Sequence, residues 1–211
     1  DELSVFNLRN LLPPVRDQGA RETCFSLALS DGHHIARAGS PMLSGDYLHF
    51  YAARRDGVGV NEAVSVNAAR AALLSDGQPS EAACVYSANP RPTEWSPPNG
   101  IAPLWRHDTV TRHANYVKMV REELADNRAC VIVLRINDAF LAAHLGTAHI
   151  DHAIGPDRGV HAVLAVAFDE EAGGILVRNT WGDDWGTSGH AWLSAAYVGQ
   201  RALVVVTFQR N

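Results

Sequence analysis

Cysteine, lysine and long apolar runs are all scarce in this 211-residue sequence. Three cysteines are too few for a disulfide scaffold, and because the number is odd, at least one thiol is free or pairs outside the chain. The longest apolar runs, 160–168 and 202–208, have the length of strands rather than that of a membrane span. We therefore expect a folded, soluble chain without a membrane span.

The charge balance and the composition exclude several other classes of protein. Lys+Arg number 18 against 23 Asp+Glu, a net charge of −5, which argues against a nucleic-acid partner. The 17 glycines and 10 prolines are too few for a collagenous or low-complexity chain. Lys118 is the single lysine, which indicates the coding bias of a GC-rich bacterial source. The first residues include neither Met nor a basic stretch, so we expect a mature form or a domain cut from a longer protein.

The first hundred residues have the apolar spacing of helices, and the second half has that of strands. We predict helices over 24–39, 46–55, 62–75 and 116–124. Six prolines and glycines between positions 89 and 103 forbid regular structure there. We predict strands over 130–136, 161–168, 175–180, 191–193 and 202–208, with a hairpin turn at 170–174. This order is typical of an α+β fold with two lobes.

Cys24 lies at the predicted start of the first helix, with Thr23 placed to act as its N-cap and Gly39 as its stop. A thiolate is the nucleophilic form of cysteine, and the N-terminus of a helix favours that anion. We therefore expect a lowered pKa for Cys24. For a cysteine considered alone, a buried structural role is the ordinary interpretation, so the choice depends on residues elsewhere in the chain.

Two motifs late in the sequence supply those residues. Gly-Val-His-Ala-Val occupies 159–163, and Arg-Asn-Thr-Trp-Gly-Asp-Asp-Trp-Gly-Thr-Ser-Gly occupies 178–189. Together with the Gln-Gly pair at 18–19, they make the chain resemble the papain-like cysteine peptidases over nearly its whole length. In that family the His and Asn lie about 130–150 residues after the nucleophile, close to the positions of His161 and Asn179.

The resemblance implies a role for each matching residue. Cys24 would be the nucleophile, and His161 would be the base that pairs with it and later protonates the leaving amine. Asn179 would orient the imidazole, and Trp181 would shield that contact from water. Gln18 would donate its side-chain amide to the oxyanion. Taken singly, these residues also fit structural roles as a surface amide, a core histidine, a turn residue and a core aromatic.

The sequence departs from the family near the nucleophile. Arg21 replaces the cysteine that forms a disulfide in secreted members, and no partner motif occurs around 59–66. Cys84 and Cys130 either pair with each other or stay reduced. Glu22 replaces a glycine beside the substrate cleft, where its carboxylate either narrows the cleft and favours cationic side chains or points outward into solvent.

The resemblance also implies an architecture and a reaction. We expect one papain-like domain over 1–211, with a helical lobe over about 10–112, a strand-rich, antiparallel and barrel-like lobe over about 113–211, and the active site in the cleft between them. The implied reaction is hydrolysis of peptide bonds through a Cys24 thioester, without a cofactor or metal. The implied partner is a peptide or protein substrate. An inhibitory propeptide or a fused regulatory domain outside this sequence is left open, as is secretion against a cytoplasmic location.

Three other interpretations are weighed against this one. His144, His149, Asp151 and His152 are dense enough to form a zinc site, but their spacing matches no standard zinc motif. A papain-like fold used only for binding would not need the four residues that carry the chemistry. The same thioester chemistry also serves deamidation, isopeptide cleavage and transpeptidation, which only the products distinguish.

Overall fold

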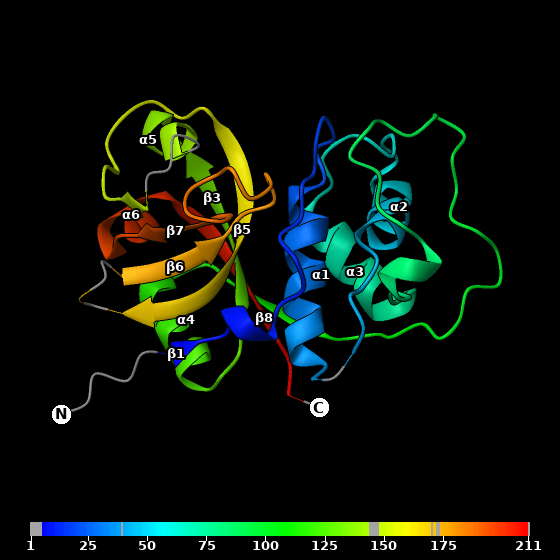
Figure 1. The fold of residues 1–211 in the computed structure, drawn as a ribbon, viewed down its shortest axis with the longest axis horizontal. Helices are drawn as coiled ribbons and strands as arrows, with labels where there is room; N and C mark the ends of the chain where they lie inside the picture. The colour runs from blue at the N-terminus through cyan, green and yellow to red at the C-terminus, as the bar shows by residue number, and fades with distance from the viewer. Residues whose placement is uncertain (1–5, 39, 144–147, 170, 172–173, 211) are drawn as a thin grey trace.

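A computed structural model describes residues 6–38, 40–143, 148–169, 171 and 174–210 of the chain. Helices α1 (Cys24–Ala36), α2 (Gly45–Asp56) and α3 (Val66–Ser75) gather on one side of the molecule, and a mixed sheet lies on the other. Figure 1 shows α1 running along the boundary between the two parts. The predicted α+β class is confirmed by this arrangement.

Side-chain caps fix where two of these helices begin. The Ser44 hydroxyl accepts from the Tyr47 N–H and starts α2, and the Ser65 hydroxyl accepts from the Ala68 N–H and starts α3. The prediction that the third helix begins at position 62 is therefore wrong by four residues. Helix α1 ends at Ala36, and the predicted stop at Gly39 lies outside the described residues.

The sheet joins strands from both ends of the chain in the order β2-β8-β3-β5-β6-β7-β4, with β1 added beside β5. Its strands are β1 (Phe6–Asn7), β2 (Thr109–Arg112), β3 (Cys130–Ile136), β4 (His149–Ile150), β5 (Gly159–Asp169), β6 (Gly174–Arg178), β7 (His190–Leu193) and β8 (Ala202–Phe208). Only β4 and β7 pair in parallel among the described pairings. Within the described residues the sheet has two ends rather than a closed circuit, so it is not a closed barrel.

Three further helices flank the sheet: α4 (Tyr116–Ala125), α5 (Asp138–Ala142) and α6 (Ala195–Arg201). Two short 3-10 helices, Arg9–Leu11 and Glu81–Ala83, complete the regular elements described. None of the described helices is both long and apolar enough to cross a bilayer. The division into lobes near position 112 stays a prediction. Strand β1 lies before the predicted helical lobe and β2 lies at its end, yet both belong to the sheet.

Helix α1 packs directly on the sheet, and this contact sets the position of Cys24. A Cβ atom added at Gly32 would lie 2.4 Å from the ring of Phe208 on β8 and 3.2 Å from Leu164 on β5. Only a glycine allows the helix to approach so closely. Helix α1 therefore lies against β5, the strand that carries His161.

A buried ion cluster also joins α1 to the sheet. The Asp31 carboxylate lies 2.7 Å from Arg16 Nε and 2.9 Å from Arg178 Nε, and all three side chains are almost fully buried. The Arg178 guanidinium also donates to the carbonyls of Pro13 and Pro14. Because Arg178 ends β6 directly before Asn179, the cluster ties the first helix to the segment that carries a predicted site residue.

Candidate active site

The structure places Cys24 at the first position of α1, partly exposed, with its side chain against β5. Thr23 occupies the cap position, as predicted, but its side chain makes no capping hydrogen bond. Its hydroxyl instead lies 2.6 Å from the hydroxyl of Tyr86. The prediction that Thr23 caps the helix is therefore wrong in its chemistry, because another partner takes up the hydroxyl.

Burial, rather than the end of the helix, dominates the titration of Cys24. Desolvation raises the pKa of the thiol because a buried thiolate is poorly solvated. Hydrogen bonds from the backbone of Ala162, Phe25 and Cys24 itself lower this pKa, and the charge of Glu22 raises it. The expected lowered pKa is not found for the thiol considered alone. The Ala162 contact nevertheless places the sulfur beside the residue that follows His161.

His161 and Asn179 are brought together at the heart of the site. His161 Nε2 lies 2.6 Å from Asn179 Oδ1, and the two side chains are 4% and 0% exposed. The Thr180 N–H donates to the same oxygen at 2.8 Å, which fixes the orientation of the amide. An amide oxygen only accepts, so Nε2 carries the hydrogen, and Nδ1 keeps its lone pair when the ring is neutral.

Aromatic rings enclose the imidazole. The Trp181 ring centroid lies 4.4 Å from that of His161 at an interplanar angle of 36°, and the Phe140 centroid lies 5.8 Å away. This burial lowers the pKa of His161 to about 4, while the contact with Asn179 acts in the opposite direction. The resting imidazole is therefore neutral near pH 7 and can accept a proton.

Gln18 reaches the same site through its backbone and its side chain. Its N–H donates to the Thr180 carbonyl at 2.7 Å, and its Oε1 accepts from the Thr180 hydroxyl at 2.8 Å. One hydrogen of its Nε2 is directed to the Arg21 carbonyl at 2.9 Å. The side-chain amide carries two hydrogens, so a second one remains to be directed elsewhere. All four predicted site residues thus converge on one place.

Arg21 is held by buried partners at the position where the resemblance implies a cysteine. Its side chain is 0% exposed, and its guanidinium lies 2.5 Å from Asp46 Oδ1 and donates to the Val60 carbonyl at 2.8 Å. Asp46 also pairs with Arg91 at 2.7 Å. A buried ion network therefore connects the region before the nucleophile with the segment around position 60, where the sequence has no partner cysteine.

The sequence also singled out Glu22, Cys84 and Cys130. The exposed Glu22 carboxylate accepts from the Ala63 N–H at 3.2 Å. Cys84 and Cys130 are both buried and free, so they do not pair with each other. Burial raises the pKa of both thiols, as it does that of Cys24. Cys24 differs from them in being partly exposed, so its sulfur is the accessible one.

The zinc alternative receives no support from the part of the chain that the structure describes. No group of three or more His, Cys, Asp or Glu side chains is gathered there at the spacing of a metal site. His144 lies outside the described residues. His149 and His152 lie on β4 and in the segment that follows it.

Comparison with known proteins identifies the family. The family model described as papain family cysteine protease matches residues 5–203. This chain belongs to the papain family of cysteine proteases. The resemblance predicted from the sequence is thereby confirmed, and with it the class of enzyme, at the level of the family. A curated relative, the cathepsin B-like cysteine proteinase 1 of Ostertagia ostertagi, is 32% identical over 77 residues, which cover 36% of this papain-family chain and 22% of the relative.

Solved structures agree on the fold. Xylellain, a cysteine protease from Xylella fastidiosa, matches with a TM-score of 0.76 at 19% identity, over 98% of this chain and 86% of that one. The Carica candamarcensis cysteine protease CMS1MS2, in complex with E-64, matches with a TM-score of 0.76 at 18% identity over 98% of both chains. Digestive procathepsin L2 of Tenebrio molitor matches with a TM-score of 0.74 at 21% identity, over 97% of this chain and 67% of that one. These likenesses confirm the papain-like fold.

Sequence reasoning missed Tyr86, Thr180 and Asp46, which hold the predicted site residues in place. Tyr86 lies in a loop without a periodic pattern, so no sequence signal marks it. Asp46 lies in the first turn of α2, where acidic residues are common at the surface, so the sequence signals its role only weakly. In the structure it is fully buried.

Proposed function

We propose that this chain hydrolyses peptide bonds with Cys24 as the nucleophile and His161 as the acid and base. The observation that carries the proposal is the 2.6 Å contact between His161 Nε2 and Asn179 Oδ1. This contact occupies Nε2, so the other ring nitrogen, Nδ1, is the proton acceptor. The next residue on the strand, Ala162, contacts the Cys24 sulfur through its backbone. Family membership and the papain-like fold support the same activity.

Acylation begins when His161 Nδ1 takes the proton of the Cys24 thiol. The sulfur attacks the substrate carbonyl and forms a C–S bond, and the negative charge moves to the carbonyl oxygen. The Cys24 N–H and the second hydrogen of Gln18 Nε2 donate to this oxyanion. When it collapses, the C–N bond breaks, and His161 delivers its proton to the departing amine.

Deacylation reverses the direction of proton transfer. His161 removes a proton from water, and the resulting hydroxide attacks the thioester carbonyl. The C–S bond then breaks, the carboxylic acid leaves, and the Cys24 thiolate regains its proton from His161. Asn179 keeps the ring in one orientation throughout, and Trp181 covers its contact with His161.

The first prediction concerns the reactivity of Cys24. Because burial raises the pKa of the free thiol, Cys24 reacts fast near pH 6 only if His161 accepts its proton. We expect iodoacetamide to label Cys24 well before Cys84 and Cys130, as followed by peptide mass spectrometry. In His161→Ala, labelling near pH 6 should slow by about 10² or more.

The pH dependence of that variant serves as its control. In His161→Ala the labelling rate should recover as the pH rises into the range where the thiol loses its proton unaided. A variant that stays unreactive at alkaline pH has lost its fold rather than its base. Equal labelling of wild type and His161→Ala near pH 6 would contradict the proposed pair.

Product analysis separates peptide hydrolysis from the alternatives. A peptide mixture incubated with the chain should yield new termini by mass spectrometry, and Cys24→Ala should yield none. If Cys24 is labelled by iodoacetamide but no peptide is cleaved, the chain is a binding module. Conversion of Gln to Glu, cleavage at Lys side chains, or joined peptides would indicate deamidase, isopeptidase or transpeptidase activity with the same thioester.

The second prediction concerns Gln18. Gln18→Ala removes one oxyanion donor, so we expect kcat to fall by about 10²–10³. Iodoacetamide labelling of Cys24 should change little, since alkylation develops no oxyanion. Parallel losses in hydrolysis and labelling would instead mean that Gln18 positions the thiol.

We further propose that a propeptide restrains the enzyme before use. One structural relative is named a procathepsin, and the ragweed allergen Amb a 11 is described in its proform. This chain covers 67% and 66% of those two proteins. Identification of the full gene product by intact mass in the source organism would test the proposal.

A further inference from the structure

A segment distant in sequence holds the loop that carries Gln18 and Cys24. We call residues 18–24 the nucleophile loop and residues 85–91 the anchoring segment. The Ala20 N–H donates to the Ala88 carbonyl at 3.1 Å, and Arg21 Nη1 donates to the Ser87 carbonyl at 2.9 Å. The middle of the nucleophile loop therefore rests on the backbone of the anchoring segment.

The Tyr86 hydroxyl joins the two ends of the nucleophile loop. It donates to the Gln18 carbonyl at 3.0 Å and lies 2.6 Å from the Thr23 hydroxyl. A phenol has a single hydrogen, and a carbonyl only accepts. Thr23 is therefore the donor to Tyr86, and one side chain fixes the residues at both ends of the loop.

This arrangement has a consequence for the start of α1. A threonine at the N-cap ordinarily accepts from a first-turn N–H, but Thr23 makes no such bond. Its backbone angles, φ −104° and ψ 9°, also differ from the extended conformation of a capping residue. The first-turn N–H groups are thus spared a side-chain acceptor, and those of Cys24 and Phe25 act on the sulfur of Cys24.

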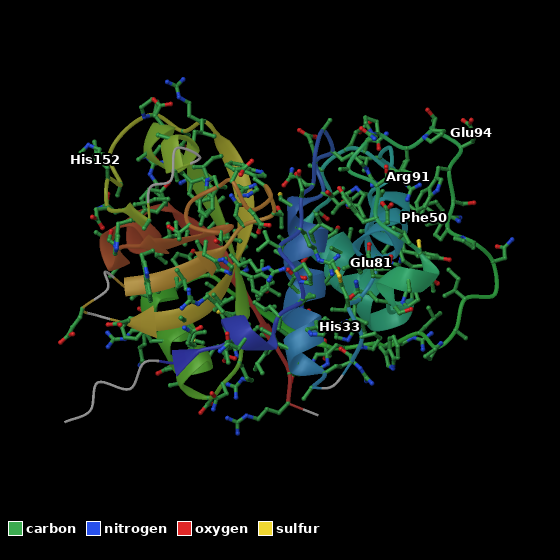
Figure 2. The ribbon with its side chains drawn as sticks, in the orientation of Figure 1. His33, Phe50, Glu81, Arg91, Glu94 and His152 are labelled. Atoms are coloured by element: carbon green, nitrogen blue, oxygen red, sulfur yellow. The ribbon has the colours of Figure 1, made fainter. Side chains whose placement is uncertain are left out.

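Tyr86 is itself held firmly. The Arg21 guanidinium lies over its ring, 5.0 Å from the centroid, and is fixed by the buried Asp46 carboxylate. The Tyr86 N–H donates to Glu81 Oε1 at 2.6 Å. Asp46 also binds Arg91, which Figure 2 shows near α2, on the same side of the molecule as Glu81. The residue that replaces the family's cysteine thereby anchors the segment that carries Tyr86.

We propose that Tyr86 is a positioning residue for the thiol chemistry: it orients Gln18 and keeps the Thr23 hydroxyl away from the helix end that stabilises the Cys24 anion. The inference rests on the proposed function. Tyr86 thereby positions both Gln18, the oxyanion donor, and Cys24, the nucleophile.

Tyr86→Phe tests the proposal because it removes only the hydroxyl and keeps the ring beneath Arg21. We expect kcat for a peptide substrate to fall about tenfold, the effect of one lost hydrogen bond at a buried site, with KM within about twofold. The midpoint of Cys24 labelling by iodoacetamide against pH should move upward by about half a pH unit, because Thr23, released from Tyr86, can then adopt the extended backbone of a capping residue and cap the helix.

Two more variants separate the two tasks. In Tyr86→Phe combined with Thr23→Val, residue 23 has no hydroxyl with which to cap, so the labelling midpoint should return to the wild-type value while kcat stays low. Thr23→Asn restores a capping side chain with Tyr86 in place, so its labelling midpoint should move upward as in Tyr86→Phe. This last variant keeps the proposal testable if Tyr86→Phe does not fold.

Tyr116→Phe is the matched control. The Tyr116 hydroxyl lies 3.0 Å from the His113 carbonyl and 2.8 Å from the Leu203 carbonyl, and these two acceptors share its one hydrogen, away from the nucleophile loop. Its removal should change neither kcat nor the labelling midpoint. The proposal is overturned if Tyr86→Phe matches this control in both measurements, or if Thr23→Asn leaves the midpoint unchanged. Wild-type labelling that does not depend on His161 would instead overturn the proposed function.

Discussion

Acidification from about pH 7 to about pH 4 is expected to unfold this protein, because three buried histidines resist protonation in the folded state. Burial lowers the pKa of His33, His49 and His161 from 6.5 to about 4. His33 lies on α1, as Figure 2 shows. His33 Nδ1 lies 2.8 Å from Gln78 Oε1 and His49 Nδ1 lies 2.9 Å from Ser26 Oγ, so each ring also occupies a fixed site.

The direction of this pH dependence follows from the number of protons that the folded and unfolded states bind. Between about pH 6.5 and about pH 4 the unfolded chain binds protons at these histidines and the folded chain does not, so stability falls as the pH falls. Each histidine contributes about 3 kcal/mol across this range. Their sum, about 10 kcal/mol, is comparable with the whole stability of a typical domain.

Urea unfolding at a series of pH values measures this effect. His33→Asn keeps an amide hydrogen for Gln78 but does not titrate, so the slope of unfolding free energy against pH should lose one of the three contributions. His113→Gln is the control, because His113 is exposed, and it should leave the slope unchanged. A free energy of unfolding that stays constant between about pH 7 and about pH 4.5 would contradict the prediction.

Asp31→Asn is expected to destabilise the fold by about 3–5 kcal/mol, the usual cost of removing one partner from a buried ion cluster. The Asp31 carboxylate lies between Arg16 and Arg178, which repel each other, and the change leaves both buried guanidiniums without it. Because Arg178 precedes Asn179, we also expect hydrolysis to weaken in molecules that remain folded. Chemical denaturation and kcat measured on the same preparation test both effects.

Asp138→Asn is the matched control for that change. Asp138 and Arg158 form a bidentate ion pair at 2.7 and 2.9 Å, but both are exposed, so its loss should change stability little. Replacing Asp31 by Leu and Arg178 by Met together should recover part of the stability, since it removes the unpaired charge as well. Equal effects of Asp31→Asn and Asp138→Asn would refute the role of the buried cluster.

The observed strands agree best with those predicted from the sequence where nearly every residue of the strand is apolar and buried. Strands β3 and β8 begin and end at the predicted residues, because uninterrupted apolar runs fit only the centre of a covered sheet. The two residues of β4, the four of β2 and the helix α6 were not predicted. Such short segments gain their structure from partners such as β7 and β8, and local propensity does not reveal them.

The sequence by itself determined the family and the fold class, and it predicted the residues that we propose carry the chemistry. The distinctive motifs around Gln18, Cys24, His161 and Asn179 are local in sequence, so they can be recognised without coordinates. The roles proposed for them come from the resemblance to the family and agree with functional-group chemistry.

Only the tertiary structure decided how those residues are held. The Thr23 hydroxyl turns to Tyr86 instead of its own helix, and Arg21 finds a buried carboxylate, Asp46, in place of a disulfide. Burial also reversed the expected shift in the pKa of Cys24. The physical reason is common to all three: hydrogen bonds, ion pairs and desolvation depend on which distant groups are adjacent in space, and a local sequence pattern does not specify them.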